Sequence, residues 1–198
     1  MITDEDKARA QVYALLGRLL TAAPDKALLA QVSSFTGDET ELGQALRALA
    51  ATARKLDARR LGEEYQDLFI GVARGELMPY ASYYLTGFLH GKPLAALRGD
   101  MTKLGIARNA GVAEPEDHIG SLCEMMAGLI TGAFDAPADL ATQRRFFNAH
   151  IAAWAPRFFT DLEAAKHAVF YMPVARLGRL FIDIEIQAFA LVAEDQAA

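Results

Sequence analysis

The sequence predicts an all-α fold, a single globular domain of about nine or ten helices over residues 1–198. Hydrophobic residues make up 53% of the chain and proline occurs only 7 times, which favours helices and argues against disorder. Nearly every apolar pattern has the 3.6-residue period of a helix, and no segment shows the alternation of a strand. A chain of 198 residues can bury a sizeable core within one domain.

The first three helices are predicted from caps and apolar faces. Thr3 and Asp6 are spaced as a capping pair at the start of the first helix. Its apolar face carries Ala8, Val12, Leu15, Leu16 and Leu19. Two further amphipathic stretches run over residues 25–35 and 38–55, and Gly37 separates them.

The middle of the chain alternates short helices with its longest irregular stretches. An apolar stripe that ends near Gly71 consists of Leu61, Tyr65, Leu68, Phe69 and Val72. Two glycines and a proline predict a loop around residues 71–80. A short helix or turn around residues 82–91 and a helix over residues 93–104 follow, and a second loop is expected around residues 105–114.

Three long helical patterns complete the chain. The first has a core face of Ile119, Leu122, Cys123, Met126, Leu129, Ile130 and Ala133. The second runs over residues 138–154, and Pro156 is expected to end or kink it, with a short piece after it through Lys166. The last runs over residues 173–193, with a face of Leu177, Leu180, Phe181, Ile184, Ala188 and Leu191. Further apolar residues, Ile182, Ile186 and Phe189, predict that it is buried on more than one side.

Charge and cysteine content exclude several classes of protein. The net charge of −5 offers no broad cationic surface for a nucleic-acid backbone, so no nucleic-acid partner is expected. A lone cysteine, Cys123, excludes an intrachain disulfide and any metal or iron–sulfur site built from cysteines alone.

Nothing predicts a leader or a membrane span. The first residues are charged and polar, unlike a signal peptide. The most apolar windows contain Glu124, or else Arg179, Asp183 and Glu185, so no membrane insertion is expected. The expected compartment is the cytoplasm.

No constellation for catalysis, metal binding or cofactor binding stands out. The four histidines are scattered, without an HExxH or a Glu-x-x-His motif; they are His90, His118, His150 and His167. Ser82 and Ser121 lack a nucleophile elbow, and no glycine-rich phosphate motif occurs. We therefore expect no catalytic residues, no metal and no cofactor.

The stretch EPEDHIG, residues 114–120, is typical of a helix start. Pro115 fits the first helical turn, where its missing N–H costs nothing. Glu116 and Asp117 would then lie where the helix dipole favours negative charge, and Asp117 can accept from free backbone amides. On this interpretation His118 is a surface or rim residue.

An aromatic stretch upstream suggests a binding surface instead. Residues 75–88 gather Met78, Pro79, Tyr80, Tyr83, Tyr84 and Phe88. Some of these rings can plug the core beneath a loop. A rim of tyrosines with neighbouring Pro and Met also suits an apolar peptide, and Asp117 would provide an acidic anchor for a basic one.

Three blocks occur in order along the chain, EYQDLFIG (64–71), PYASYY (79–84) and EPEDH (114–118). Together they resemble the signature of the TorD/DmsD/NarJ family of cytoplasmic chaperones for molybdoenzymes, nearer to its TorD/DmsD branch. The family pattern is approximately EYxxLFxG, PYxSxY and PxDH before an apolar helix. The matching residues are Glu64, Tyr65, Leu68, Phe69, Gly71, Pro79, Tyr80, Ser82, Tyr84, Pro115, Asp117 and His118. One departure is that Trp154, the single tryptophan, is far from the motifs in sequence, whereas some relatives place tryptophans near the peptide site.

The resemblance implies a chaperone with a TorD-like fold and no enzymatic activity. It would bind the twin-arginine signal peptide and the apo form of a molybdoenzyme, assist insertion of the molybdopterin cofactor and delay export. The implied peptide-binding residues are Tyr80, Ser82, Tyr84, Pro115, Asp117 and His118. The implied supporting residues are Glu64, Tyr65, Leu68, Phe69, Gly71 and Pro79.

Two other functions stay open from the residues alone. One is a helical enzyme that uses Asp117 and His118 as acid and base, although no nucleophile or metal-ligand set accompanies them. The other is a helical scaffold or regulatory protein, although neither a basic recognition helix nor a heptad seam is present. The client, the choice between a monomer and a domain-swapped dimer, and any binding of a guanine nucleotide are not predicted.

Overall fold

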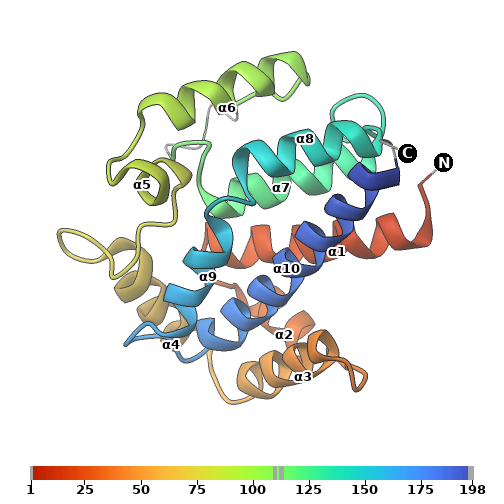
Figure 1. Cartoon of the computed structure of the whole chain (residues 1–198). Coiled ribbons are helices and arrows are strands. Elements are labelled where there is room, and N and C mark those ends of the chain that lie inside the picture. The colour runs from red at the N-terminus through yellow and green to blue at the C-terminus, as the bar shows by residue number, and fades with distance from the viewer. Residues whose placement is uncertain (1, 109–110, 112–113, 196–198) are drawn as a thin grey trace. The chain divides into compact units, whose positions relative to one another are not determined.

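A computed structural model of the chain describes residues 2–108, 111 and 114–195. Within these ranges the chain forms ten α-helices and one π-helical turn (Figure 1). The described residues contain no strand, and two of them form an isolated β-bridge, Tyr80 with His118. The all-α class is confirmed. No helix in the described ranges is long and apolar enough to cross a membrane.

The chain divides into two compact units, each assembled from two separate stretches of sequence. Residues 1–21 and 79–155 form unit 1, and residues 22–78 and 156–198 form unit 2. The helical pattern alone gives no sign of this division, because both units share the same period and composition. The single domain over residues 1–198 stays a prediction.

Unit 1 is built around the packing of its first helix on its central one. Its helices are α1 (Asp4–Thr21), α5 (Ala81–Thr86), α6 (Gly91–Lys103), α7 (Ile119–Thr131) and α8 (Leu140–His150). Helix α1 packs along α7, α8 lies on α7, and α5 packs on α6 (Figure 1). A Cβ on Gly120 would lie 2.6 Å from Thr21 Cγ2, and one on Gly17 would lie 2.7 Å from Glu124 Cγ. Two glycines therefore let these helices approach closely.

The start of α1 matches the expected capping pair. Thr3 Oγ1 accepts a hydrogen bond from the Asp6 backbone N–H at 3.0 Å, and the Asp6 carboxylate accepts from Thr3 in return. The predicted apolar face is partly wrong. Ala8 is exposed, while Tyr13 and Leu20 are buried, because the buried stripe lies further round the helix.

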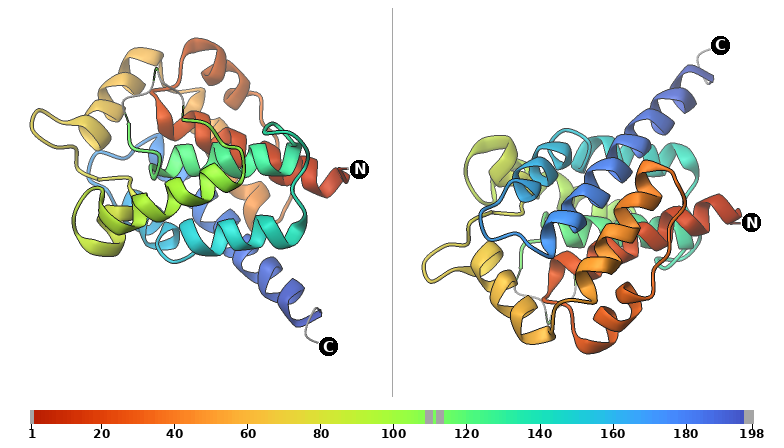
Figure 2. Two further views of the ribbon diagram at one scale, coloured as in Figure 1. Left: turned by 90° about the horizontal axis from the view of Figure 1, so that it is seen from above. Right: turned by 90° about the horizontal axis from the view of Figure 1, so that it is seen from below.

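Unit 2 consists of α2 (Lys26–Ser33), α3 (Glu41–Ala53), α4 (Ala58–Tyr65), the π-helical turn η1 (Gln66–Ile70), α9 (Ala155–Glu163) and α10 (Tyr171–Asp195). Helix α3 packs on α2 and on α10, and the C-terminal turns of α10 continue past α3 (Figure 2, right). Asp25, Thr40 and Asp57 cap α2, α3 and α4 through their side-chain oxygens.

Two predictions for the C-terminal third are wrong in detail. Helix α8 ends at His150, before Pro156, and the proline lies in the first turn of α9, where its missing N–H costs nothing. On α10, Ile184 and Leu191 are 47% and 64% exposed, whereas Glu185 is buried. Leu177 and Phe181 of the predicted face are buried, but from there on the buried residues are Ile182, Glu185 and Phe189, one residue from the predicted positions. Periodicity cannot separate these faces, because apolar residues surround much of this helix.

Candidate functional site

Two motif blocks of unit 1 are joined by main-chain hydrogen bonds. The Ala81 N–H donates to Asp117 O at 3.0 Å, and the Ile119 N–H donates to Pro79 O at 2.8 Å. These bonds form the antiparallel bridge between Tyr80 and His118. Helix α5 begins directly after one side of the bridge and α7 after the other. We call residues 79–84 and 114–118 together the corner.

Asp117 caps a helix, but not the one that follows it. Its side chain is 1% exposed, and its Oδ2 accepts a hydrogen bond from the Ser82 backbone N–H in the first turn of α5 at 2.8 Å. Helix α7 is capped by His118, whose Nδ1 accepts from the Gly120 N–H at 3.0 Å. The interpretation of EPEDHIG as the first turn of α7 is therefore wrong for Pro115, Glu116 and Asp117.

The reason for this difference is a turn ahead of the helix. The His118 N–H donates to Pro115 O at 3.2 Å, and α7 begins only at Ile119. Pro115 thus precedes the helix by four residues. A sequence of proline and acids before an apolar run suits both a first turn and such a preceding turn, so the local pattern cannot separate them.

Glu116 is paired with two arginines. Its carboxylate accepts from both Nε and Nη2 of Arg98, the latter at 2.8 Å, and lies 3.4 Å from Arg108 Nε. The Glu116 side chain is 8% exposed and that of Arg98 is 50% exposed. Burial by itself raises the pKa of Glu116, but the hydrogen bonds from Arg98 and the backbone, together with the charges of Arg98 and Arg108, hold the pKa below its ordinary value.

His118 is buried and neutral. Burial lowers the pKa of His118 to about 4, so the ring is uncharged at neutral pH. Because Nδ1 accepts a hydrogen bond, Nε2 carries the ring proton. The ring meets Tyr80 edge-on, with centroids 5.3 Å apart, and the Tyr80 hydroxyl donates to the Glu114 carboxylate.

The predicted peptide-binding residues divide by exposure. Ser82 and Asp117 are buried, and Ser82 Oγ accepts from the His90 N–H at 3.0 Å, so both side chains hold the corner together. Tyr80, Tyr84 and Pro115 are half-buried and reach the surface. Contact of any of the six with a peptide stays a prediction.

The single tryptophan belongs to this region after all. The Trp154 ring lies 5.5 Å from the Tyr84 ring, and its Nε1 donates to His150 O at 2.7 Å. Trp154 is only 2% exposed, so it supports Tyr84 from within unit 1. Trp154 follows Tyr84 by 70 residues, so nothing in the sequence indicates that the two rings meet.

Asp117 and His118 do not form an acid–base pair. The atoms that would face each other in such a pair, Asp117 Oδ2 and His118 Nδ1, each accept from a different backbone amide. Among the residues that the structure describes, no His, Cys, Asp and Glu side chains gather as a metal site. Cys123 is fully buried, and burial raises the pKa of its thiol.

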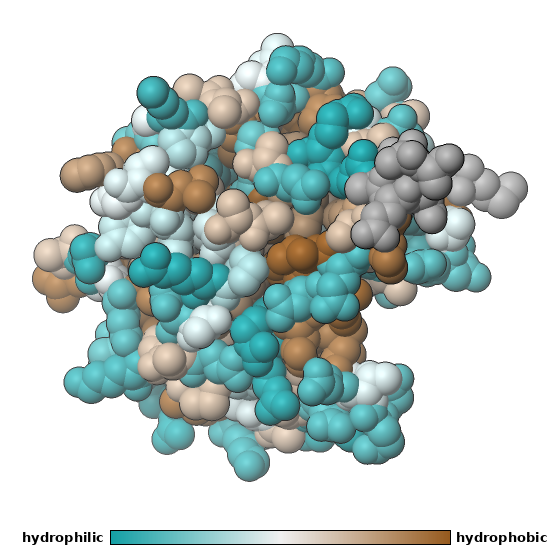
Figure 3. Space-filling model, viewed as in Figure 1, coloured by the Kyte–Doolittle hydropathy of each residue, from teal (hydrophilic) through white to brown (hydrophobic). Residues whose placement is uncertain are grey.

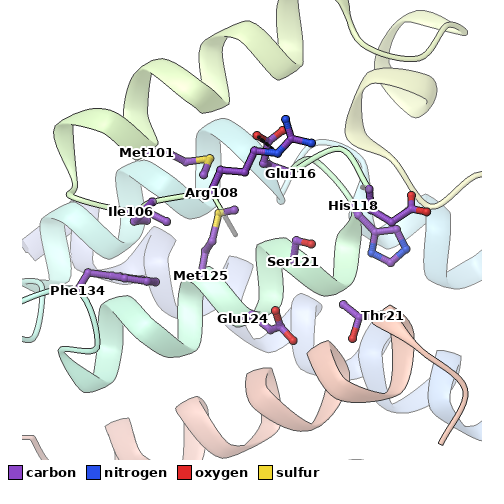
Figure 4. Close-up of a pocket in the computed structure, with 12 residues that line it drawn as sticks. Thr21, Met101, Ile106, Arg108, Glu116, His118, Ser121, Glu124, Met125 and Phe134 are labelled. Atoms are coloured by element: carbon purple, nitrogen blue, oxygen red, sulfur yellow. Dashed lines mark ion pairs between the residues drawn. The ribbon is translucent and has the colours of Figure 1, made fainter. Parts of the chain in front are cut away.

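A pocket of about 430 Å³ opens beside the corner, entirely within unit 1 (Figure 4). Glu114, Glu116 and His118 of the corner line it together with Ser121 and Glu124 of α7. Its apolar wall consists of Met101, Ile106, Met125 and Phe134. Sequence reasoning missed Glu124 as a site residue, because a single acid within an apolar helix has no motif around it.

The first motif block, residues 64–71, lies in unit 2, where it anchors the start of α10. The Glu64 carboxylate accepts from the backbone N–H groups of Val169, Phe170 and Tyr171 at 2.8, 3.0 and 2.8 Å. The rings of Tyr65, Phe69 and Tyr171 meet with centroids 5.0 to 6.0 Å apart. Within unit 2 this block therefore fixes the start of α10, and its support of a peptide site stays a prediction.

Other residues of that block shape its end. Leu68 is fully buried and Phe69 is 8% exposed, whereas Val72 is fully exposed, so the apolar stripe stops before the expected residue. Gly71 has a φ of 65°, and a Cβ there would lie 2.0 Å from Arg74 O, so the turn after η1 requires glycine. Pro79 is buried in unit 1 and accepts the bridge hydrogen bond from Ile119.

Comparison with known proteins identifies the family. The sequence model of the family described as "Nitrate reductase delta subunit" matches residues 36–160. The chain belongs to this family. The resemblance carried by the three motif blocks is confirmed.

Relatives in this family share most of their length with the chain. The chaperone protein TorD of Aliivibrio fischeri is 28% identical over 96% of this chain and 98% of its own. TorD of Vibrio cholerae (Classical Ogawa) is 29% identical over 77% and 76%. A solved structure from Archaeoglobus fulgidus, described as a redox enzyme maturation protein, matches with a TM-score of 0.58 and 22% identity over 88% of this chain and 93% of its own. It supports the fold, and the named relatives support a TorD-like maturation chaperone and not an enzyme.

Proposed function

We propose that this member of the nitrate reductase delta subunit family binds the twin-arginine signal peptide and the apo form of a molybdoenzyme. In this role it assists molybdopterin insertion and delays export until the client is complete. The full-length match to TorD chaperones supports the class of protein. The cytoplasm is the compartment that this role requires, because the leader is read before export.

The observation that carries the proposal is the corner with its pocket. Main-chain bonds hold two motif blocks together, and the pocket beside them combines carboxylates with an apolar wall. A twin-arginine leader has the same two features, a basic region followed by an apolar one. Preformed sites of this kind bind with little loss of conformational entropy.

The residues of the corner have different roles in this proposal. Tyr80 and Tyr84 offer half-buried rings to an apolar segment, and Pro115 adds a rigid edge. His118 borders the pocket through its neutral ring. Asp117 and Ser82 act through position, since their side chains hold α5 against the start of α7.

Three exposed apolar side chains follow the corner in the sequence, and together they form what we call the α5 surface. Leu85, Phe88 and Leu89 are 45%, 78% and 38% exposed at the end of this helix and in the turn after it. Figure 3 shows hydrophobic residues both as separate spots and as a larger patch near the middle of a face that is otherwise largely hydrophilic. In the proposal this surface receives part of the apolar region of the leader.

The test is calorimetric titration with synthetic leader peptides of molybdoenzymes encoded beside the gene. We expect one leader to bind, and Tyr80→Ala and His118→Ala to weaken it by about tenfold. The control is Val72→Ala, which shortens an exposed side chain of unit 2 and leaves the affinity unchanged. Absence of binding to every leader overturns the function. Unchanged binding by both corner variants overturns the site.

A further inference from the structure

One carboxylate of the pocket is not used by the fold. Glu124 lies in the second turn of α7, and its side chain borders the pocket (Figure 4). Within the described residues it makes no hydrogen bond or ion pair, although it is solvent-accessible. Gly17 of α1 leaves room for its side chain, because a Cβ there would lie 2.7 Å from Glu124 Cγ.

The other acids of the pocket are already satisfied. Glu116 is bound by Arg98 and Arg108, and Glu114 accepts from the Tyr80 hydroxyl. His118 is neutral. Glu124 is therefore the carboxylate of this pocket that is left for a ligand. Partial burial raises the pKa of Glu124, and Arg108, the cation that lines the same pocket, lies 3.4 Å from Glu116.

The opposite side of the pocket defines the rest of the ligand. Met101, Ile106, Met125 and Phe134 form an apolar wall in the same cavity (Figure 4). Thioether side chains adapt to irregular aliphatic groups. A cation that suits this pocket therefore carries an aliphatic stem. A peptide carbonyl next to that stem can accept the Nε2 proton of His118.

We propose that the pocket binds an arginine side chain of the client peptide, with the guanidinium on the Glu124 carboxylate and the methylene stem along Met101 and Met125. This assignment rests on the proposed peptide-binding function and makes Glu124 a specificity-determining residue within it. Arginine suits the pocket better than lysine, because a guanidinium is more weakly hydrated than an ammonium and can pair with a carboxylate through two hydrogen bonds.

The test is a double-mutant cycle between the protein and a leader that binds the wild-type chain. Each arginine of the leader is replaced in turn by citrulline, which keeps the shape and removes the charge. The protein variant is Glu124→Gln, which removes the charge of the acid in the same way. Affinities of the four combinations are measured by calorimetry, and circular dichroism checks that the variant is folded.

We expect Glu124→Gln to reduce the affinity for the arginine leader by about tenfold. When citrulline replaces the arginine that occupies the pocket, the same variant should leave the affinity for the leader nearly unchanged. The matched control is Glu5→Gln, an exposed acid on α1 of the same unit. It removes the same charge and should weaken both leaders equally and only slightly.

The outcomes separate this inference from the function on which it rests. Suppose that a leader binds the wild-type protein, and that Glu124→Gln reduces its affinity by the same factor whether each position carries arginine or citrulline. This result overturns the arginine pocket and leaves the proposed function standing. A lysine leader that binds as tightly as the arginine leader also overturns it. If no leader binds the wild-type chain, the proposed function fails first.

Discussion

The Asp117 carboxylate caps α5 by accepting the Ser82 N–H at 2.8 Å, 35 residues earlier in the chain. The acid of one motif block is thus a structural part of the other. Its second oxygen, Oδ1, is buried without a hydrogen-bond partner among the described residues, so the cap is its one polar contact through the side chain.

Removing this cap should destabilise the protein more than removing an exposed one. Asp117→Ala leaves the buried Ser82 N–H without its partner, and we expect a loss of about 2 kcal/mol in the free energy of unfolding. The control is Asp57→Ala, where an exposed aspartate caps α4 and about 1 kcal/mol is expected. Urea denaturation measures both. Equal losses would contradict the structural role of Asp117.

Glu64, the buried acid of the first motif block, should contribute far more to stability than its exposed neighbour Glu63. Glu64→Gln replaces an oxygen that accepts backbone N–H groups at the start of α10 by an amide that cannot accept them. We expect a loss of about 2–3 kcal/mol in the free energy of unfolding. Glu63→Gln, which removes an exposed pair with Arg59, should cost less than about 0.5 kcal/mol. A similar melting temperature for the two variants would argue against the anchor.

Replacing each of two helical glycines by alanine should change the free energy of unfolding in opposite directions. Gly120→Ala places a methyl group against Thr21 at the contact of α1 with α7, and we expect a loss of about 1–3 kcal/mol. Gly99→Ala on α6 meets no atom within 4 Å, so it should stabilise by about 0.5–1 kcal/mol through helix propensity. Thermal unfolding of both variants compares them directly. Stabilisation by Gly120→Ala would show that the two helices have room to separate.

His118 should make stability fall in weak acid. The pKa of His118 is about 4 in the folded protein and about 6.5 in the unfolded chain. Between these values the unfolded chain binds a proton that the folded protein does not. Neutral, buried His118 therefore contributes fully to the free energy of unfolding above pH 6.5. This contribution decreases by up to about 3 kcal/mol as the pH falls to 4.

The matched variant is His118→Asn, because asparagine can still cap α7 but does not titrate. Its stability relative to wild type should improve steadily from pH 7 to pH 4.5 in urea denaturation. The lowered pKa of His150 and the raised pKa of Glu124 are present in both proteins and cancel in this comparison. Parallel curves for the two proteins would contradict the buried, neutral state of His118.

The helices could be predicted from sequence because their evidence is local. Periodicity located the longer helices, and the Thr3–Asp6 pair indicated the correct first turn. The two short helices were less distinct, because α5 was expected as a short helix or turn and α9 as a short piece after Pro156. The buried face was less certain on α10, where Ile184 and Glu185 stand next to each other and periodicity favours the apolar residue although the acid is buried.

The site was predictable only as far as its motifs. Each block was recognised from its own residues, but the contacts that build the site join residues far apart in the sequence. Asp117 to Ser82 and Trp154 to Tyr84 leave no local pattern, since they depend on which helices pack together. Glu124 is the plainest case, because only the cavity shows that its carboxylate has no partner within the described residues.

The β-bridge between Tyr80 and His118 is held by backbone atoms, so the fold depends little on the side chains at these two positions. Its hydrogen bonds use the backbone atoms of Pro79, Ala81, Asp117 and Ile119, and none of them needs the side chain at position 80. At position 118 the fold requires only a side chain that can cap α7, which asparagine, aspartate or serine also provides. Under the proposed function, these two neighbouring positions beside the pocket can therefore change during evolution, or by design, to suit a new client while the helices around them keep their places.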